Sequence, residues 1–287
     1  MSSNKKYILS GIIIFILVSI GAGCGYYHYL HRENQKLDSQ KIKTQLEETP
    51  GVFTTQKADG IVIFLHSGGF VVEKNEYHEA FGAAIGQQLG FDYVVPDYPV
   101  NTTYKETLSY MEEIYKNARE QYDKVWFIGC SAGANLAVAS MLKYGDTYGM
   151  PDKLILMSPW LDTSMGNENI ECVSDFDKEF YASLVTWGEN YNGGDKKTIY
   201  ASPLKAKKSQ LKNFPETIMF EGELDILRFD AEKFSQKLEE AGVNCTYVTA
   251  KGKNHGEVFA EFAGNMQIPE IMKPYITENE KIIQKNQ

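Results

Sequence analysis

The sequence predicts an α/β fold with a mostly parallel central sheet flanked by helices. Short apolar runs rich in β-branched and aromatic residues recur along the chain, and each run is continuously apolar rather than alternating. Continuous apolarity in such short runs is typical of strands buried on both faces of a parallel sheet. Longer amphipathic stretches lie between the runs. The resulting alternation of strand and helix is the pattern of an α/β domain.

Each element can be placed along the chain from these two patterns. Strands are expected at residues 61–65, 93–95, 125–128, 154–157, 217–220 and 245–248. Helices are expected at residues 76–89, 104–122, 132–144 and 229–241. We therefore place one α/β domain at residues 59–287.

The alternation breaks once, in an insertion at about residues 162–201 that carries no strand signal. Irregular excursions of this length within a compact domain are usually functional. The spacing of Phe176, Phe180, Leu184 and Trp187 predicts a helix with one apolar face. We expect a small helical lid over the active site; the alternative interpretation is an irregular surface loop.

The charge pattern and the cysteines exclude several classes of function. The formal net charge is −9, and acidic and basic residues are interspersed from residue 30 onward. A nucleic-acid partner is not expected, because phosphate binding needs a clustered basic face. The four cysteines form no CxxC pair and have no nearby histidine at zinc-ligand spacing. We therefore expect no metal and no disulfide framework.

The amino-terminal segment differs from the rest of the chain. Residues 7–27 contain no charge, residues 8–20 are almost wholly aliphatic, and Lys5 and Lys6 precede them. A bilayer-spanning helix needs about 20 apolar residues to cross roughly 30 Å of hydrocarbon. We predict a single-pass membrane anchor within residues 1–29 and an extracytoplasmic domain.

The alternative for this segment is a signal peptide that is cleaved or lipidated at Cys24, which would leave the domain secreted or lipid-anchored. Small residues precede Cys24, but Gly21 stands where such sites usually carry a Leu-like residue. Tyr26 and Tyr27 suit the membrane interface of a retained helix. Residues 30–58 are polar and mixed in charge, and we interpret them as a stalk or linker between anchor and domain.

The strongest chemical signal is a G-x-S-x-G element centred on Ser131, at residues 129–133. It lies between an expected strand and an expected helix. A serine on such a sharp turn exposes its hydroxyl above the sheet, and the flanking glycines give the cramped backbone room. The helix amino terminus supplies N–H groups and partial positive charge for a developing oxyanion. Ser131 is the predicted nucleophile.

A glycine pair follows the first expected strand. Gly68 and Gly69 let the backbone approach a substrate closely, and acyl transfer needs two or more N–H donors on the carbonyl oxygen. We predict an oxyanion hole made by Gly68, Gly69 and the N–H of Ala132. Without Ser131, a plain glycine turn would be the preferred interpretation. His66, just before, is expected to brace this loop by hydrogen bonding.

The remaining catalytic groups follow from their order in this fold, in which the serine precedes the acid and the acid precedes the histidine. Of five histidines, only His255 follows Ser131. Three acids, Glu221, Glu223 and Asp225, follow the expected strand at 217–220 and compete for the third position. Asp225 is favoured, because the neighbouring glycine turn and apolar residues would hold it in a structured loop. Glu223 is the alternative.

With these residues in place, the sequence resembles the hormone-sensitive-lipase-like family of α/β-hydrolases from about residue 61 to residue 259. The shared motifs, in order, are HSGGF at 66–70, DYP at 97–99, GCSAGANLA at 129–137, SPWLD at 158–162, GELDILRFD at 222–230 and NHG at 254–256. The resemblance implies the α/β-hydrolase fold and carboxylic ester hydrolysis without a cofactor. It also implies the same catalytic triad and oxyanion residues.

Three features depart from the family pattern. Ser67 replaces the first glycine of HGGG, so the two donor glycines remain while the flexibility of the loop changes. Cys130 stands where an acidic residue commonly precedes the nucleophile. The part before residue 61 is short, so the usual amino-terminal cap and first strands are expected to be reduced.

The resemblance implies an acyl-enzyme mechanism on small-molecule esters. An apolar acyl site formed by Phe176, Phe180 and Trp187 near Trp160 would favour short to medium acyl or acetyl esters. Alternative functions are removal of acetyl groups from a cell-envelope polysaccharide or a sterol, or amide cleavage. A non-catalytic binding module on a hydrolase scaffold is a further alternative, because a fold does not fix function.

Overall fold

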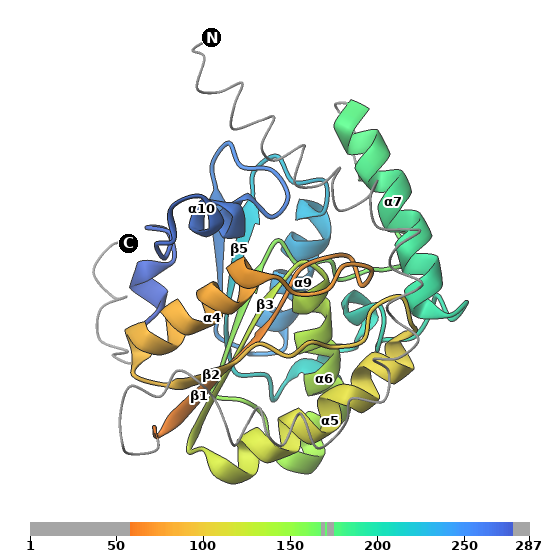
Figure 1. The fold of residues 1–287 in the computed structure, drawn as a ribbon. Coiled ribbons are helices and arrows are strands. Elements are labelled where there is room, and N and C mark those ends of the chain that lie inside the picture. Colours follow the sequence, from red (N-terminus) through yellow and green to blue (C-terminus); the bar gives the residue numbers. More distant parts are fainter. Residues whose placement is uncertain (1–57, 168–169, 171–174, 278–287) are drawn as a thin grey trace, which may run out of the picture. The chain divides into compact units, whose positions relative to one another are not determined.

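Six parallel strands form the central sheet of the computed structural model, which describes residues 58–167, 170 and 175–277 (Figure 1). The strand order is β2-β1-β3-β4-β5-β6. The strands are β1 (Gly60–Leu65), β2 (Asp92–Val94), β3 (Lys124–Cys130), β4 (Lys153–Met157), β5 (Glu216–Gly222) and β6 (Cys245–Ala250). Every strand expected from the apolar runs is present, and the prediction of a parallel sheet is confirmed.

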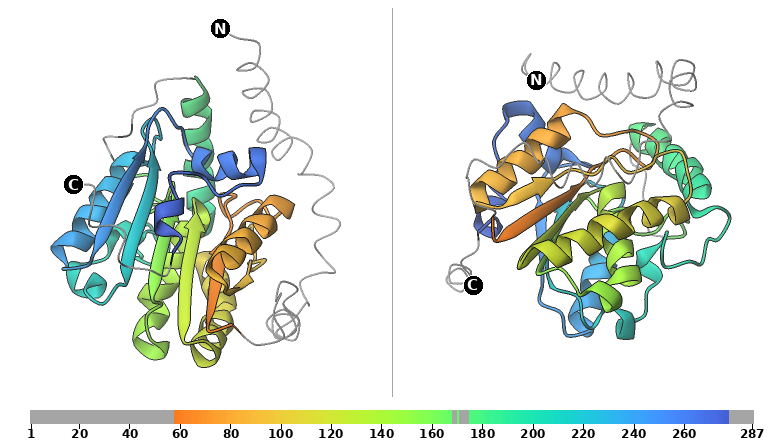
Figure 2. Two further views of the ribbon diagram at one scale, coloured as in Figure 1. Left: turned by 90° about the vertical axis from the view of Figure 1, so that its left-hand side faces the viewer. Right: turned by 60° about the horizontal axis from the view of Figure 1, so that its bottom comes forward.

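Helices cover both faces of this sheet (Figure 1). They are α4 (Glu76–Leu89), α5 (Tyr104–Gln121), α6 (Ala132–Tyr148), α7 (Asp175–Asn192), α8 (Lys208–Leu211), α9 (Arg228–Glu240) and α10 (Glu257–Asn265), with short 3₁₀ turns at Pro203–Lys205 and Lys273–Tyr275. Helices α5, α6 and α9 pack on one face, while α4 and α10 lie beside each other on the opposite face (Figure 2). The four expected helices are present within a few residues of their predicted bounds.

The strand order places a crevice at the carboxyl ends of β1 and β3. The chain leaves β1 toward β2 at one edge and returns to β3 on the other side of β1. Ligands of open α/β sheets bind where the order reverses in this way, outside the carboxyl ends of the strands. The register aligns those ends, since Leu65 pairs with Gly129 and Cys130 pairs with Met157. The loops after β1 and β3 therefore meet at one point.

The core on the α4 and α10 face is built from the apolar runs themselves. Phe64, Ile128, Ile155 and Phe220 stand on four neighbouring strands and are fully buried. The segment after α10 completes this core, because Met272 and other residues near it are buried against the same cluster. Sequence patterning missed both α10 and this segment, since each is too short for a clear apolar period.

The predicted anchor at 1–29 lies outside the described residues, as does all of the predicted linker at 30–58 except its last residue. Both stay predictions, together with the boundary at residue 59. Within the part of the chain that the structure describes, no helix combines the length and apolarity needed to cross a membrane.

Candidate active site

Ser131 occupies a strained turn between β3 and α6. Its backbone has φ 54° and ψ −114°, a positive-φ conformation that costs a non-glycine residue about 1–3 kcal/mol. Hydrogen bonds on both sides hold the turn: the Ser131 N–H donates to the Met157 carbonyl at 2.9 Å, and the Trp160 N–H donates to the Ser131 carbonyl at 3.3 Å. The strain at this residue is therefore imposed by the two neighbouring segments.

Gly133 shows why the turn needs glycine on the helix side. A Cβ at this position would stand 2.0 Å from the Leu65 carbonyl oxygen. Any side chain there would push α6 away from β1. The glycine lets the first turn of α6 pack directly on the strand that leads into the glycine pair at 68–69, which brings the two loops together.

His255 reaches Ser131 from the loop between β6 and α10. Its Nε2 lies 2.9 Å from the Ser131 Oγ. Its Nδ1 lies 2.9 Å from the Asp225 Oδ2, and because a carboxylate only accepts, Nδ1 carries the hydrogen and Nε2 is free to accept from the serine hydroxyl. The loop is fixed at Ser158, whose Oγ accepts the N–H of Gly256 at 3.0 Å. Ser158 is the first residue of the SPWLD motif, to which sequence reasoning gave no separate role.

Asp225 is the acid that reaches His255. It is fully buried, and its second oxygen accepts the N–H of Leu227 at 2.9 Å. Burial alone would raise the pKa of Asp225, but attraction and hydrogen bonding from His255, with smaller contributions from Glu221 and the Leu227 N–H, hold it at about 2. Glu223, the alternative acid, is exposed and accepts the N–H of Gly252 instead.

The glycine pair lies on a braced loop. Gly68 and Gly69 have φ of 127° and 62°, and the Gly68 carbonyl accepts the N–H groups of the residues three and four positions on, both at 3.0 Å. His66 donates from Nδ1 to the Ser67 carbonyl at 2.7 Å, as expected for a bracing residue. It also stacks on Tyr98 with ring centroids 4.1 Å apart, and the Tyr98 hydroxyl donates to the His66 carbonyl.

Ser67, which departs from the family pattern, anchors this loop to α4. Helix α4 begins after Asn75, whose N–H donates to Nδ1 of His78 at 3.0 Å. Burial lowers the pKa of His78 to about 3, so its imidazole is neutral and its Nε2 donates to the Ser67 Oγ at 3.1 Å. The hydroxyl thus gives the loop an attachment that a glycine could not supply.

Helix α7 of the predicted insertion lies against these residues. A Cβ on Gly69 would stand 2.5 Å from the Trp187 Cε3, so the indole covers the glycine directly. The Phe180 ring lies 4.8 Å from the His255 ring between centroids. Leu184 is buried, as its place on the predicted apolar face requires, whereas the side chain of Phe176 lies outside the described part of the chain.

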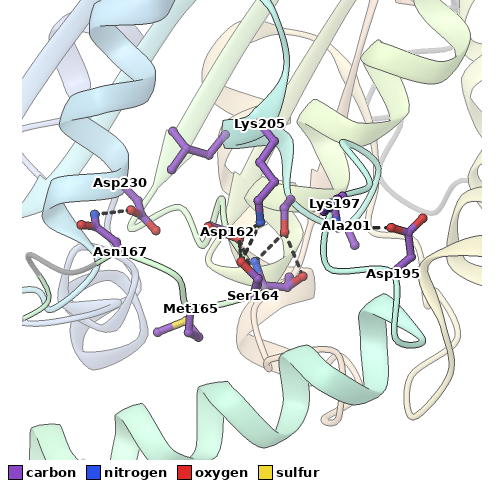
Figure 3. A network of polar contacts seen from close by, with 12 residues as sticks. Asp162, Ser164, Met165, Asn167, Asp195, Lys197, Ala201, Lys205 and Asp230 are labelled. Carbon is purple, nitrogen blue, oxygen red and sulfur yellow. Dashed lines mark hydrogen bonds and ion pairs between the residues drawn. The ribbon is translucent and has the colours of Figure 1, made fainter.

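A polar network closes the base of the insertion, as Figure 3 shows. Asp162 accepts from the Lys205 Nζ at 2.6 Å and from the Ser164 N–H at 2.9 Å, so the two ends of the insertion are tied together. Beside it, the Asn167 amide donates to Asp230 of α9 at 2.5 Å (Figure 3).

Asn135 of α6 also holds the base of the insertion, through hydrogen bonds. It is fully buried, and its amide nitrogen donates to the carbonyls of Trp160 and Ala201, both at 2.8 Å. One side chain from the helix after Ser131 thereby holds the segments that enter and leave the insertion. The GCSAGANLA motif contains Asn135, but only the fold reveals this contact.

A cavity of about 280 Å³ lies between the glycine loop, the segment before α5 and helix α7. It is lined by uncharged side chains: Phe70, Val71, Asn101, Thr102, Thr103, Trp187, Asn190 and Tyr191. Among the described residues, no group of three or more His, Cys, Asp or Glu side chains could hold a metal ion.

Fold and site are both those of the α/β-hydrolase class, in which a parallel sheet presents a serine on a strand-to-helix turn. A family model described as "alpha/beta hydrolase fold" matches residues 62–259. The chain therefore belongs to this family, which contains the hormone-sensitive-lipase-like esterases.

Two curated proteins and one solved structure are similar to the chain. The chain is 25% identical over 218 residues to the vegetative-specific protein H5 of Dictyostelium discoideum, covering 69% of this chain and 63% of the relative. It is 27% identical over 198 residues to an esterase of Acinetobacter venetianus, covering 65% and 63%. The chain thus spans about 63% of the length of both relatives. A thermostable esterase of Pseudomonas putida has the same fold, with a TM-score of 0.66, 24% identity, and coverage of 79% of this chain and 75% of that one.

Proposed function

We propose that the protein is a serine carboxylic ester hydrolase that acts on short to medium acyl or acetyl esters of small molecules. The observation that carries the proposal is the continuous hydrogen-bonded chain from Ser131 through His255 to Asp225, with 2.9 Å at each contact. The esterase named among the relatives supports the same reaction class.

In the proposed cycle, His255 takes the proton of the Ser131 hydroxyl as the oxygen attacks the ester carbonyl. Asp225 holds the imidazole in the tautomer that accepts this proton and stabilises the imidazolium that forms. The N–H groups of Gly68, Gly69 and Ala132 stabilise the oxyanion. His255 then protonates the departing alcohol, and a water molecule activated by the same imidazole releases the acid from Ser131.

The proposed acyl range rests on helix α7. Trp187 and Phe180 lie against Gly69 and His255, so α7 acts as a lid whose aromatic side chains limit the space around the reacting carbonyl. We therefore expect small acyl groups to be preferred over long ones.

The test is labelling with a fluorophosphonate probe together with a chain-length series of nitrophenyl esters. We expect wild-type protein to label and to turn over the shorter esters, and Ser131→Ala to do neither. Ser209→Ala, which changes an exposed serine of α8, is the matched control and should behave as wild type. Turnover that survives in Ser131→Ala, or a wild type that neither labels nor hydrolyses any ester, would refute the proposal; the latter result would favour a binding module.

The cavity beside the glycine loop favours a second candidate, removal of acetyl groups from a carbohydrate. Its lining of two amides, two threonines and an indole, with no charged side chain, suits a neutral hydroxyl-rich ring. The predicted anchor would place the domain next to envelope polymers, and we propose a membrane-anchored, extracytoplasmic enzyme on that sequence evidence. Acetylated polysaccharide that is cleaved faster than nitrophenyl acetate would favour this candidate, and acetylated polysaccharide that is left intact would exclude it.

A further inference from the structure

Glu221 is a second carboxyl group buried beside Asp225, and the proposed reaction does not use it. It lies near the end of β5, four residues before Asp225, and pairs in register with Thr249 of β6. Both acids are fully buried. The Oε2 atom of Glu221 is buried and accepts from no donor among the described residues. The adjacent Asp225 carboxyl disfavours an ionised Glu221, because two ionised carboxylates buried together repel each other. We therefore expect the pair to hold one proton.

The distribution of donors decides which acid holds this proton. Asp225 receives a hydrogen bond on each oxygen, from His255 and from the Leu227 N–H. Glu221 receives one, from the Gly222 N–H to Oε1 at 3.0 Å. No donor among the described residues reaches its Oε2. The negative charge is better stabilised on Asp225, so the proton belongs to Glu221.

The electrostatic surroundings agree with this assignment. Burial, and then the charge of Asp225, raise the pKa of Glu221 well above its ordinary value. The ionisable side chains that act on Glu221, or on which it acts, come from four elements: Asp225 in its own loop, Cys130 of β3, Glu232 of α9 and Tyr247 of β6. Cys130 and Tyr247 are neutral at physiological pH, because burial raises the pKa of each. None of these groups supplies positive charge to an ionised Glu221.

We propose that Glu221 is a positioning residue that stays protonated and donates its carboxyl proton to Asp225. This contact fixes the Asp225 carboxylate in the orientation in which it accepts from His255. It also keeps the pair at a single negative charge, so that the imidazole faces one carboxylate. The inference rests on the proposed esterase function for its kinetic consequence, but the protonation of Glu221 is a property of the folded protein itself.

The test compares Glu221→Gln, which keeps a donor in nearly the same shape, with Glu221→Leu, which keeps the volume and loses the donor. Glu223→Gln, on the exposed side of the same loop, is the matched control. With nitrophenyl butyrate we expect kcat of Glu221→Gln and Glu223→Gln within about threefold of wild type. We expect Glu221→Leu to lose tenfold or more in kcat, with KM little changed. Equal losses in the Gln and Leu variants, or a wild-type kcat in the Leu variant, would overturn the proposal.

A second measurement does not depend on activity or on the folding of the Leu variant. A group whose pKa is raised in the folded state stabilises the fold fully below its unfolded pKa, and this stability is lost as pH rises through the folded pKa. The free energy of unfolding of wild type, measured with urea, should therefore fall relative to that of Glu221→Gln as pH rises above about 4.5. If the unfolding free energies of the two proteins change in parallel with pH, Glu221 is ionised and the inference is refuted. Loss of esterase activity in all proteins with divergent unfolding profiles would refute only the proposed function.

Discussion

The indole of Trp187 covers Gly69, the second glycine of the loop after β1, so closely that a methyl group on the glycine would stand 2.5 Å from Cε3. Helix α7 and the predicted oxyanion loop are thus fitted to each other. The contact explains why this position needs glycine even apart from its φ of 62°.

Gly69→Ala should lower kcat/KM by about 100-fold, because displacing a reacting group or donor by about 1 Å costs that much. In Gly69→Ala/Trp187→Ala the collision is removed, and we expect about tenfold of the loss to be recovered. The remaining loss reflects the left-handed backbone, which costs a non-glycine residue about 1–2 kcal/mol. Values of kcat/KM for the two single variants and the double variant give the coupling free energy between Gly69 and Trp187. Additive losses would show that Trp187 does not constrain the loop.

Asp225→Asn should reduce kcat by about 10⁴-fold, the scale seen when the triad acid of a serine protease is changed in this way, because the amide no longer enforces the His255 tautomer. Glu223→Gln removes one carboxylate at the same loop and should leave kcat within about threefold of wild type, since Glu223 contacts Gly252 rather than the histidine. Steady-state hydrolysis of nitrophenyl butyrate distinguishes them. Comparable losses in both variants would mean that the loop, rather than Asp225 itself, determines the rate.

Asn135→Ala should destabilise the fold by about 2–6 kcal/mol, because two buried carbonyls each lose their donor at about 1–3 kcal/mol apiece. Those carbonyls belong to Trp160 and Ala201 at the base of the insertion. Urea unfolding measures the loss. Ser209→Ala is the control for a truncation on the surface, and an unfolding free energy of Asn135→Ala equal to that of the control would contradict the role given to Asn135.

Asp230 makes stability depend on pH. Burial raises the pKa of Asp230 to about 6, despite the hydrogen bond from Asn167. Because the folded-state pKa lies above the unfolded value, the carboxyl stabilises the fold below about pH 4 and this stability is lost as pH rises through 6. Asp230→Asn mimics the protonated acid. The unfolding free energy of Asp230→Asn should therefore rise relative to that of wild type by about 2 kcal/mol between pH 4 and pH 7.

The comparison needs urea unfolding of both proteins at several pH values in that window. Asp177→Asn supplies a control at another buried acid. A difference between wild type and Asp230→Asn that stays constant with pH would show that Asp230 is ionised throughout.

Local sequence patterns were sufficient to predict the strands of the sheet, because strands buried on both faces must be apolar at every position. The run at 61–65 and the run at 154–157 each became a strand within one residue. Helix α10 and the buried Met272 escaped prediction because their apolar residues pack against distant strands and repeat too few times to form a pattern.

The sequence by itself determined the α/β class, the serine between strand and helix, and the one histidine that follows it, since these depend on residue type and on order along the chain. The choice among three acids within five residues was decided only by the tertiary structure. The turn at Gly222 exposes Glu223, directs Asp225 to His255 and buries Glu221 beside it. Spacing cannot separate these outcomes, because burial and charge at each carboxyl are set by β3, β6 and α9, which reach the turn from far along the chain.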